Sequence, residues 1–321
     1  MKFYIIIGLI VATLAILITI VLIPSTKDFA LDNPLWNGMS ISSNRYYFKS
    51  ISSEQVYKLR SSDVLLIVGV ERNIDVTYIR SFVYKGGKLI VFEDYGYGFE
   101  LLKRMGIDVD VYRGILIDPL YYYKSTVIPR IRTIYNKTLF FNYGTAFSRY
   151  TGRCIAWSSY FSYIDLDLDK KPDSNEPKGP FCVGIEVSYG KGTIIVFSDA
   201  SIAINTMFNL NKEFLDTFFK KGIYVVSDIW IPDLYTYIRS RIMYFLNICL
   251  YTSFRYPFLA LLTLGIAEAF SRIYSYQKRK TIETKDIIKR VLLKHPSWNR
   301  DVIEQLLRDI GYGYREIERK D

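Results

Sequence analysis

Residues 84–107 read YKGGKLIVFEDYGYGFELLKRMGI, and this stretch decides the fold class. Two glycines precede a short apolar run, Lys88–Phe92, which ends at the acidic residues Glu93 and Asp94. A turn with two further glycines follows, and Phe99–Met105 then has the apolar spacing of a helix. The stretch therefore predicts a strand, a turn and a helix, the unit from which parallel sheets are built.

Similar units lie on both sides of this stretch. Asp63–Val70 is apolar enough for a strand that is buried on both faces, and Val76–Lys85 has the pattern of an amphipathic helix. Residues 190–199, GKGTIIVFSD, repeat the glycine, lysine, apolar run and final aspartate of residues 86–94. Ile223–Val226 is a last short strand. Strands that alternate with helices predict parallel crossovers and a doubly wound sheet.

Two regions of this part of the chain have a different pattern. Residues 138–142, 154–158 and 182–188 have the pattern of strands without helices between them, which predicts an antiparallel extension of the sheet. Near the start, Tyr46–Ile51 is predicted to be the first strand. Ser52 and the residues after it have the spacing of a helix with a capping box.

The composition indicates a folded chain with a basic balance. Half of the 321 residues are hydrophobic, and 42 lysines and arginines stand against 32 aspartates and glutamates. Such a surplus is compatible with nucleic acid or with an anionic membrane surface as partner. No nucleic-acid-binding motif accompanies it, so we expect a membrane and no nucleic acid.

Two apolar stretches are predicted to cross a membrane. Phe3–Ile23 carries no charge and is long enough for a hydrocarbon core of about 30 Å. Its length favours an uncleaved anchor over a cleaved signal peptide. The second stretch, Tyr256–Tyr274, is apolar apart from Glu268 and Arg272, and a basic cluster at residues 278–280 follows it. A buried helix is the alternative for this second stretch.

The basic cluster predicts the orientation, because cytoplasmic flanks are rich in lysine and arginine. Both termini are then cytoplasmic, and the main domain is extracytoplasmic. The expected parts are the anchor, the α/β domain, an interfacial helix with the second span, and a cytoplasmic tail, at residues 1–24, 25–232, 233–277 and 278–321. The tail has two short amphipathic patterns, Lys285–Lys294 and Arg300–Ile310. So small a hairpin buries little by itself, which points to a partner or a membrane surface.

Four stretches together carry a resemblance to a known family: NPLWNG (33–38), SSDVLLIVGV (61–70), residues 84–107 as quoted above, and GKGTIIVFSDASIAINTMFN (190–209). The chain resembles prokaryotic membrane proteins of unknown function whose extracytoplasmic domain is similar to class I glutamine amidotransferases. Parts of the auxiliary subunits of gliding-type ABC transport systems are similar too. The resemblance covers about residues 30–230 and both predicted spans. It implies a flavodoxin/class I amidotransferase-like sheet and a cell-envelope role, with a MoxR-type AAA ATPase among the expected partners.

The catalytic set of that fold is missing here. Class I amidotransferases use a cysteine on a strand-to-helix turn, and a histidine activates it. The matching turn, Glu93–Gly98, contains neither cysteine nor serine, and the single histidine, His295, is in the tail. The turn also lacks the glycine spacing of a dinucleotide site and the lysine of a P-loop, so no cofactor is expected.

The acidic residues at the strand ends are the remaining candidates for chemistry. Asp94 and Asp199 both follow strands, and the carboxyl ends of parallel strands line the ligand crevice of an open α/β sheet. The two carboxylates are predicted either to cap the helices that follow them or to act as a hydrolytic pair. The remaining residues of this predicted ligand rim are Glu93, Tyr95, Ser201, Asn205 and Asn211.

Three further patterns in the sequence are an acidic stretch, a pair of cysteines and a glycosylation pattern. In residues 165–176, DLDLDKKPDSNE, acids occupy four EF-hand positions, but Lys170 replaces the required glycine, so we expect a solvated loop and no metal. Cys154 and Cys182 each begin a strand-like run, and a disulfide between them is an open alternative to free thiols. Asn136 begins the glycosylation pattern Asn-Lys-Thr.

The leading functional hypothesis is a non-enzymatic, membrane-anchored binding or scaffold component of a cell-envelope complex. Two alternatives remain at this point. One is an extracytoplasmic hydrolase that uses Asp94 and Asp199, and the other is an auxiliary subunit of an ABC-type transporter.

Overall fold

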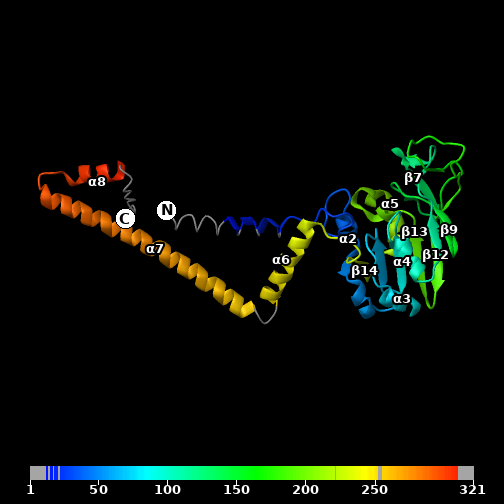
Figure 1. The fold of residues 1–321 in the computed structure, drawn as a ribbon, viewed down its shortest axis with the longest axis horizontal. Coiled ribbons are helices and arrows are strands. Elements are labelled where there is room, and N and C mark those ends of the chain that lie inside the picture. Colours follow the sequence, from blue (N-terminus) through cyan, green and yellow to red (C-terminus); the bar gives the residue numbers. More distant parts are fainter. Residues whose placement is uncertain are drawn as a thin grey trace. The chain divides into compact units, whose positions relative to one another are not determined.

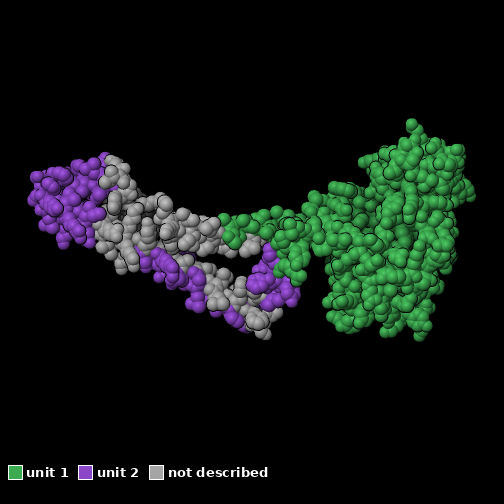
Figure 2. All heavy atoms as spheres, viewed as in Figure 1, with its two compact units in different colours: residues 1–241 green, residues 242–321 purple. Residues whose placement is uncertain are grey.

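The computed structural model describes residues 12–309 except 14, 17, 21, 221 and 252–254. The chain divides into two compact units, residues 1–241 and residues 242–321 (Figure 2). The first unit contains a mixed sheet with ten strands and the helices that pack on it, and the second contains helices (Figure 1). Each unit is described by itself.

Five parallel strands form one half of the large sheet (Figure 1). Their spatial order is β1 (Lys49–Ile51), β14 (Ile223–Val226), β2 (Val64–Val68), β3 (Lys88–Phe92) and β13 (Gly192–Phe197). The connecting helices are α3 (Thr77–Tyr84), α4 (Gly98–Arg104), the 3-10 turn η2 (Ala200–Ala203) and α5 (Asn205–Phe218). From β2 onward, the strands and helices that the sequence predicted in this half are confirmed, with ends that shift by one or two residues.

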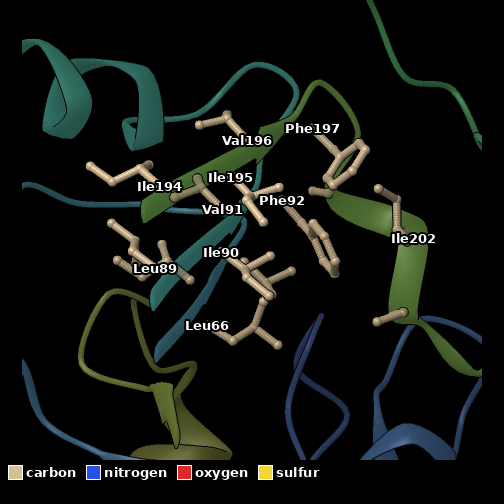
Figure 3. Packing of buried hydrophobic residues seen from close by; sticks show 14 of the residues in the cluster. Leu66, Leu89, Ile90, Val91, Phe92, Ile194, Ile195, Val196, Phe197 and Ile202 are labelled. Carbon is tan, nitrogen blue, oxygen red and sulfur yellow. The ribbon is translucent and has the colours of Figure 1, made fainter. Parts of the chain in front are cut away.

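The centre of this half is apolar because its strands are covered on both faces. Leu66, Ile90 and Ile195 are cross-strand partners in β2, β3 and β13, and all three are buried (Figure 3). At the strand ends the rings of Phe92 and Phe197 meet edge to face, with centroids 5.9 Å apart. Burial of one such side chain contributes roughly 1.5–3 kcal/mol, so this run of apolar residues fixes the register of the parallel strands.

The second half of the sheet is antiparallel. From β13 outward the strands are β12 (Cys182–Tyr189), β10 (Arg153–Trp157), β7 (Ser125–Thr133) and β6 (Tyr122–Tyr123), and β8 (Leu139–Phe140) also pairs with β7. Two small sheets pair β11 (Tyr163–Asp165) with β5 (Ile115–Ile117), and β4 (Val109–Val111) with β9 (Phe147–Tyr150). A disulfide links Cys154 of β10 to Cys182 of β12, with the two Cα atoms 5.9 Å apart.

The segment before β2 differs from the prediction. Helix α2 (Ser40–Tyr46) was not predicted and ends on Tyr46, the first residue of the expected strand, and β1 starts only at Lys49. Tyr47 adopts a left-handed backbone conformation with φ of 55°, which ends the helix. The helix after β1 is a 3-10 helix, η1 (Ser53–Lys58). Ser53, its first residue, donates its N–H and its hydroxyl to the carboxylate of Asp228, at 2.9 and 2.6 Å. These partners are distant in sequence, so local patterns could not predict them.

Helix α6 (Leu234–Tyr251) crosses the division between the units, and the second unit contains α7 (Arg255–Lys294) and α8 (Arg300–Asp309). The two amphipathic patterns of the tail become the end of α7 and α8. Ile288 of α7 and Ile303 of α8 are buried.

The predicted membrane arrangement is wrong. The first expected span, Phe3–Ile23, lies largely outside the described residues. Among the residues that the structure describes, no helix is both long enough and apolar enough to cross a bilayer. The second expected span, Tyr256–Tyr274, is instead part of the 40-residue helix α7. Within it Glu268 and Arg272 form an ion pair of 2.7 Å. The flanking transmembrane helices, the cell-membrane location and the assignment of parts to the two sides of a membrane are therefore not supported.

We expect the double variant C154S/C182S to unfold more easily than the wild type. The disulfide joins residues 28 apart. Closing such a loop lowers the entropy of the unfolded chain, which stabilises the folded protein by about 3–4 kcal/mol in the loop-entropy account. Urea titrations of the variant and of the wild type would measure the difference in unfolding free energy. Wild-type protein treated with dithiothreitol is the matched control and is expected to lose the same amount. Equal stability of all three samples would contradict the prediction.

Candidate functional site

The carboxyl ends of β3 and β13 bring the predicted acidic residues to one edge of the sheet. The two strands are parallel neighbours with Phe92 opposite Phe197, so Glu93 and Asp94 follow one strand where Asp199 closely follows the other. Glu93 donates its N–H to the carbonyl of Phe197 at 3.1 Å. Burial raises the pKa of Asp199 well above its usual value, and the nearby charge of Asp94 raises it further.

The Glu93 carboxylate is buried and accepts hydrogen bonds from the backbone. One oxygen, Oε2, accepts the N–H of Val70 at 2.8 Å and that of Gly98 at 3.1 Å. The other, Oε1, accepts the N–H of Gly96 at 2.9 Å and that of Asp94 at 3.1 Å. Burial raises the pKa of Glu93 to about 7, although these N–H donors favour the ionised form. The side chain thus ties the end of β2 to the turn before α4.

The glycines of the turn explain how a carboxylate fits there. A Cβ on Gly98 would lie 2.5 Å from Oε2 of Glu93, and a Cβ on Gly96 would lie 2.8 Å from Oε1. Only a residue without a side chain lets both N–H groups approach the carboxylate. The sequence Glu-Asp-Tyr-Gly-Tyr-Gly therefore describes a loop that is organised around its own first residue. This spacing was a visible signal, but the sequence alone did not give the direction in which the glutamate points.

The two aspartates also bind the backbone of their own chain. Asp199 is fully buried, and its oxygens accept the N–H of Ser201 and that of Asn142, both at 2.6 Å. Asp199 is the N-cap of η2, as the capping alternative predicted. Asp94 is partly exposed and accepts the N–H of Tyr95 at 2.7 Å. Burial raises the pKa of Asp94 as well.

The other residues of the predicted rim form hydrogen bonds with other parts of the fold. Tyr95 donates its hydroxyl to the carbonyl of Gly114 at 2.8 Å. Asn205 donates to the carbonyls of Asn33 and Leu35 and accepts the N–H of Ile41, so it holds the segment before α2. Ser201 offers its N–H to Asp199, as described above.

Asn211 likewise serves the fold. Its side chain is buried and bonds both the N–H and the carbonyl of Phe140. Asn205 and Asn211 are therefore clamps between distant segments, and neither contributes to a ligand rim.

Segments from both ends of the first unit cover the neighbouring strand ends. A Cβ on Gly69, directly after β2, would lie 2.4 Å from the ring of Phe29, so the N-terminal segment packs directly on this strand end. The indole N–H of Trp230 donates to the carbonyl of Val68 at 2.8 Å. Where an open α/β sheet usually holds its ligand, this chain places its own side chains.

The acidic loop after β11 is also held by its own backbone. One oxygen each of Asp165, Asp167 and Asp169 lie within 4.8 Å of one another. However, Asp165 accepts the N–H groups of Leu168 and Lys170, at 2.8 and 3.1 Å. Glu176 accepts the N–H groups of Leu166 and Asp173, at 2.8 and 3.0 Å. These carboxylates shape the loop, and we assign no metal to it.

A pocket that the sequence analysis missed lies on β7, in the antiparallel half. Its volume is about 480 Å³, within the usual range for small-molecule sites. The residues that line it are basic, aromatic or small and polar, apart from Ile131: Tyr121, Arg130, Ile131, Arg132, Thr133, Asn136, Lys137, Thr138, Ser159, Tyr160 and Phe161. Asn136, the residue of the glycosylation pattern, is exposed in a turn with φ of 54°. The sequence feature that could have indicated this pocket is the pair of arginines, Arg130 and Arg132, on either side of an isoleucine.

Comparisons with known proteins give no family. No family model matches the chain, and no curated protein matches it either. Among solved structures, the N-terminal domain of mmIFT52 aligns with 53% of this chain and 80% of that domain, at 12% identity and a TM-score of 0.39. The exo-β-1,4-mannosidase Op5Man5 from Opitutaceae bacterium strain TAV5 aligns with 50% of this chain and 26% of its own, at 11% identity and a TM-score of 0.31.

A third solved structure, the β-galactosidase from Bacillus circulans sp. alkalophilus, aligns with 47% of this chain and 22% of its own, at 16% identity and a TM-score of 0.26. This chain therefore matches about a quarter of each glycosidase. Likenesses this weak carry no argument about function.

We expect the unfolding free energy to fall as the pH rises from about 5 to about 7. Glu93 ionises near 4.5 in the unfolded chain and near 7 in the folded protein, so its contribution is present below the first value and lost through the second. The loss from this residue is up to about 3 kcal/mol at 1.36 kcal/mol per pKa unit. Urea titrations across this window would measure it. The variant E93Q is expected to show a smaller slope, and equal slopes would contradict the assignment.

We expect G98A to lower the unfolding free energy by about 1–3 kcal/mol, because the added methyl group overlaps the Glu93 carboxylate. The same substitution in an E93A background is the control. There the overlapping oxygens are absent, so the added cost of G98A shrinks, and a double-mutant cycle measures the coupling. Equal costs in both backgrounds would show that the strain has another source.

Proposed function

We propose that this chain is a non-enzymatic binding and scaffold protein whose α/β domain is a degenerate relative of the class I amidotransferase fold. The observation that carries the proposal is the hydrogen bonding of the acidic residues at the strand ends. The carboxylates of Glu93 and Asp199 accept backbone N–H groups through both oxygens, from their own loops and from distant segments. Groups committed in this way stabilise the fold and have little freedom to act on a substrate.

The hydrolase alternative requires Asp94 and Asp199 to face one open pocket. Asp199 is fully buried, which leaves Asp94 as the partly exposed member of the pair. A single exposed carboxylate lacks the second group that acid–base or nucleophilic hydrolysis uses. The buried aspartate therefore favours the binding role over hydrolysis.

A second surface supports a scaffold role. On helix α8, Val302 and Leu306 lie four residues apart on one face, and each is 53% exposed. Trp298, just before the helix, is also exposed, and its ring stacks on His295 with centroids 4.4 Å apart. Exposed apolar residues grouped on one helix face are typical of protein interaction sites. The family resemblance makes a MoxR-type AAA ATPase the first partner to test.

We expect no hydrolytic activity that depends on Asp94. Purified wild-type protein and D94N would be compared on glutamine and on chromogenic ester, amide and glycoside substrates. Because the paired carboxylate is buried, both proteins should give the same background rates. A wild-type rate a hundredfold or more above that of D94N on any of these substrates would overturn the non-enzymatic proposal in favour of the hydrolase.

We expect L306E to lose protein partners, because it places a charge within the apolar face of α8. The intact chain would serve as bait, and quantitative mass spectrometry would compare the proteins that it retains, with the MoxR-type ATPase as the named candidate. Capture should fall at least fivefold for L306E. Gln305 is exposed and lies about 100° around the helix from Leu306, so Q305E adds the same charge at an adjacent position as a control and should remain within twofold of the wild type. Equal capture by L306E and the wild type would remove the role of α8.

A further inference from the structure

The floor of the pocket on β7 presents two arginines to one side. Strand residues alternate between faces, so Arg130 and Arg132 share the exposed face while Ile131 is buried on the other. Residues two apart on a strand have Cα atoms about 7 Å apart. Nη2 of Arg130 donates to the hydroxyl of Thr138 at 3.2 Å, on the neighbouring hairpin arm. The floor is thus a pair of guanidinium groups on a rigid sheet.

The residues that line the pocket do not neutralise its positive charge. None of the described residues that line it is acidic, and neither Arg130 nor Arg132 forms an ion pair among the described residues. The third basic residue, Lys137, pairs with Glu213 at 3.1 Å, but the Glu213 side chain is 77% exposed. An exposed pair of this kind contributes little, so Lys137 is easily drawn to another anion. Guanidinium groups bind carboxylate, sulfate and phosphate oxygens two at a time.

Aromatic side chains form the wall of the same pocket. Tyr121, Tyr160 and Phe161 are 51, 74 and 55% exposed, and the rings of Tyr121 and Phe161 have centroids 6.1 Å apart. Three large rings beside a charged floor give an apolar surface that the fold itself leaves uncovered. The apolar C–H face of a sugar ring stacks on such a surface.

The wall is held in place before any ligand arrives. The hydroxyl of Ser162 donates to the carbonyl of Ser159 at 2.7 Å, and Phe161 donates its N–H to Oγ of Ser159 at 3.1 Å. On the opposite side, the carboxylate of Asp118 accepts the N–H of Tyr121 at 2.8 Å. A preformed wall lowers the entropy cost of binding, which is typical of a built ligand site.

We propose that this pocket binds an acidic saccharide, with the carboxylate or sulfate on Arg130 and Arg132 and the sugar ring against Tyr121 and Phe161. Thr133, Asn136 and Ser159 offer hydroxyl and amide groups around the pocket, and these match sugar hydroxyls. The inference rests on the proposed binding role and names a ligand class for it. A single-stranded nucleic acid also combines anions with rings, and it is the competing outcome of the test.

Calorimetry on the full chain, produced without N-glycosylation because Asn136 lines the pocket, tests the proposal. The probes are trigalacturonic acid for a carboxylate, a sulfated trisaccharide for a sulfate, neutral galactotriose, and a hexathymidylate. An acidic trisaccharide should bind at least tenfold more tightly than galactotriose, and whichever acid binds better identifies the preferred anion. R132Q should weaken that binding at least tenfold, and F161A at least fivefold. Arg132 and Phe161 are exposed, so urea midpoints should not change.

The matched control is R153Q on β10, which removes the same charge from an exposed arginine outside the pocket that pairs with Glu186. It should leave saccharide affinity within twofold of the wild type. The proposal is overturned if neither acidic trisaccharide binds, if hexathymidylate binds more tightly than both, or if R153Q and R132Q weaken binding equally. The α8 capture assay does not involve these residues, so a failure here leaves the scaffold role standing.

Discussion

The first unit depends on one buried carboxylate that accepts four backbone N–H groups. Glu93 joins Val70, two residues after β2, to the end of its own strand β3 and to the turn that starts α4. Without these donors, a buried glutamate would leave its oxygens unsatisfied at a cost of several kcal/mol. The glycines of the turn exist in this place because the carboxylate needs their N–H groups at close range. The position of α4 therefore follows from the satisfaction of a single side chain.

At the carboxyl ends of its strands, this chain differs in structure from enzymes built on open α/β sheets. In those enzymes the carboxyl ends of the strands are left free for a ligand. Here Asp199 caps η2, and Phe29 and Trp230 cover the neighbouring strand ends. Free basic and aromatic side chains occur instead on the antiparallel half, around Arg132. The pocket that we propose as a binding site thus lies on the antiparallel half, and the chain's own side chains fill the strand ends of the parallel half.

Local patterns predicted the parallel half well because its strands are buried on both faces, as Lys88–Phe92 shows. Prediction failed where distant partners decide the outcome. Asp228 accepts the N–H of Ser53 at the start of η1, and Asn205 donates to the carbonyl of Asn33 in the segment before α2. The membrane interpretation of Tyr256–Tyr274 is not supported, because no helix among the described residues, α7 included, is both long enough and apolar enough to cross a bilayer.

By itself, the sequence determined most of the strands and helices of the parallel half, and the absence of cysteine and serine from the turn after β3. These are properties of short stretches, and apolar periodicity or residue type records them directly. Only the tertiary structure decided where the polar side chains point. It turned Glu93 and Asp199 inward, and it set the rings of Tyr121 and Phe161 beside the arginines of β7. Hydrogen bonds and ring contacts between residues far apart along the chain form only after the strands have paired, so no local pattern contains them.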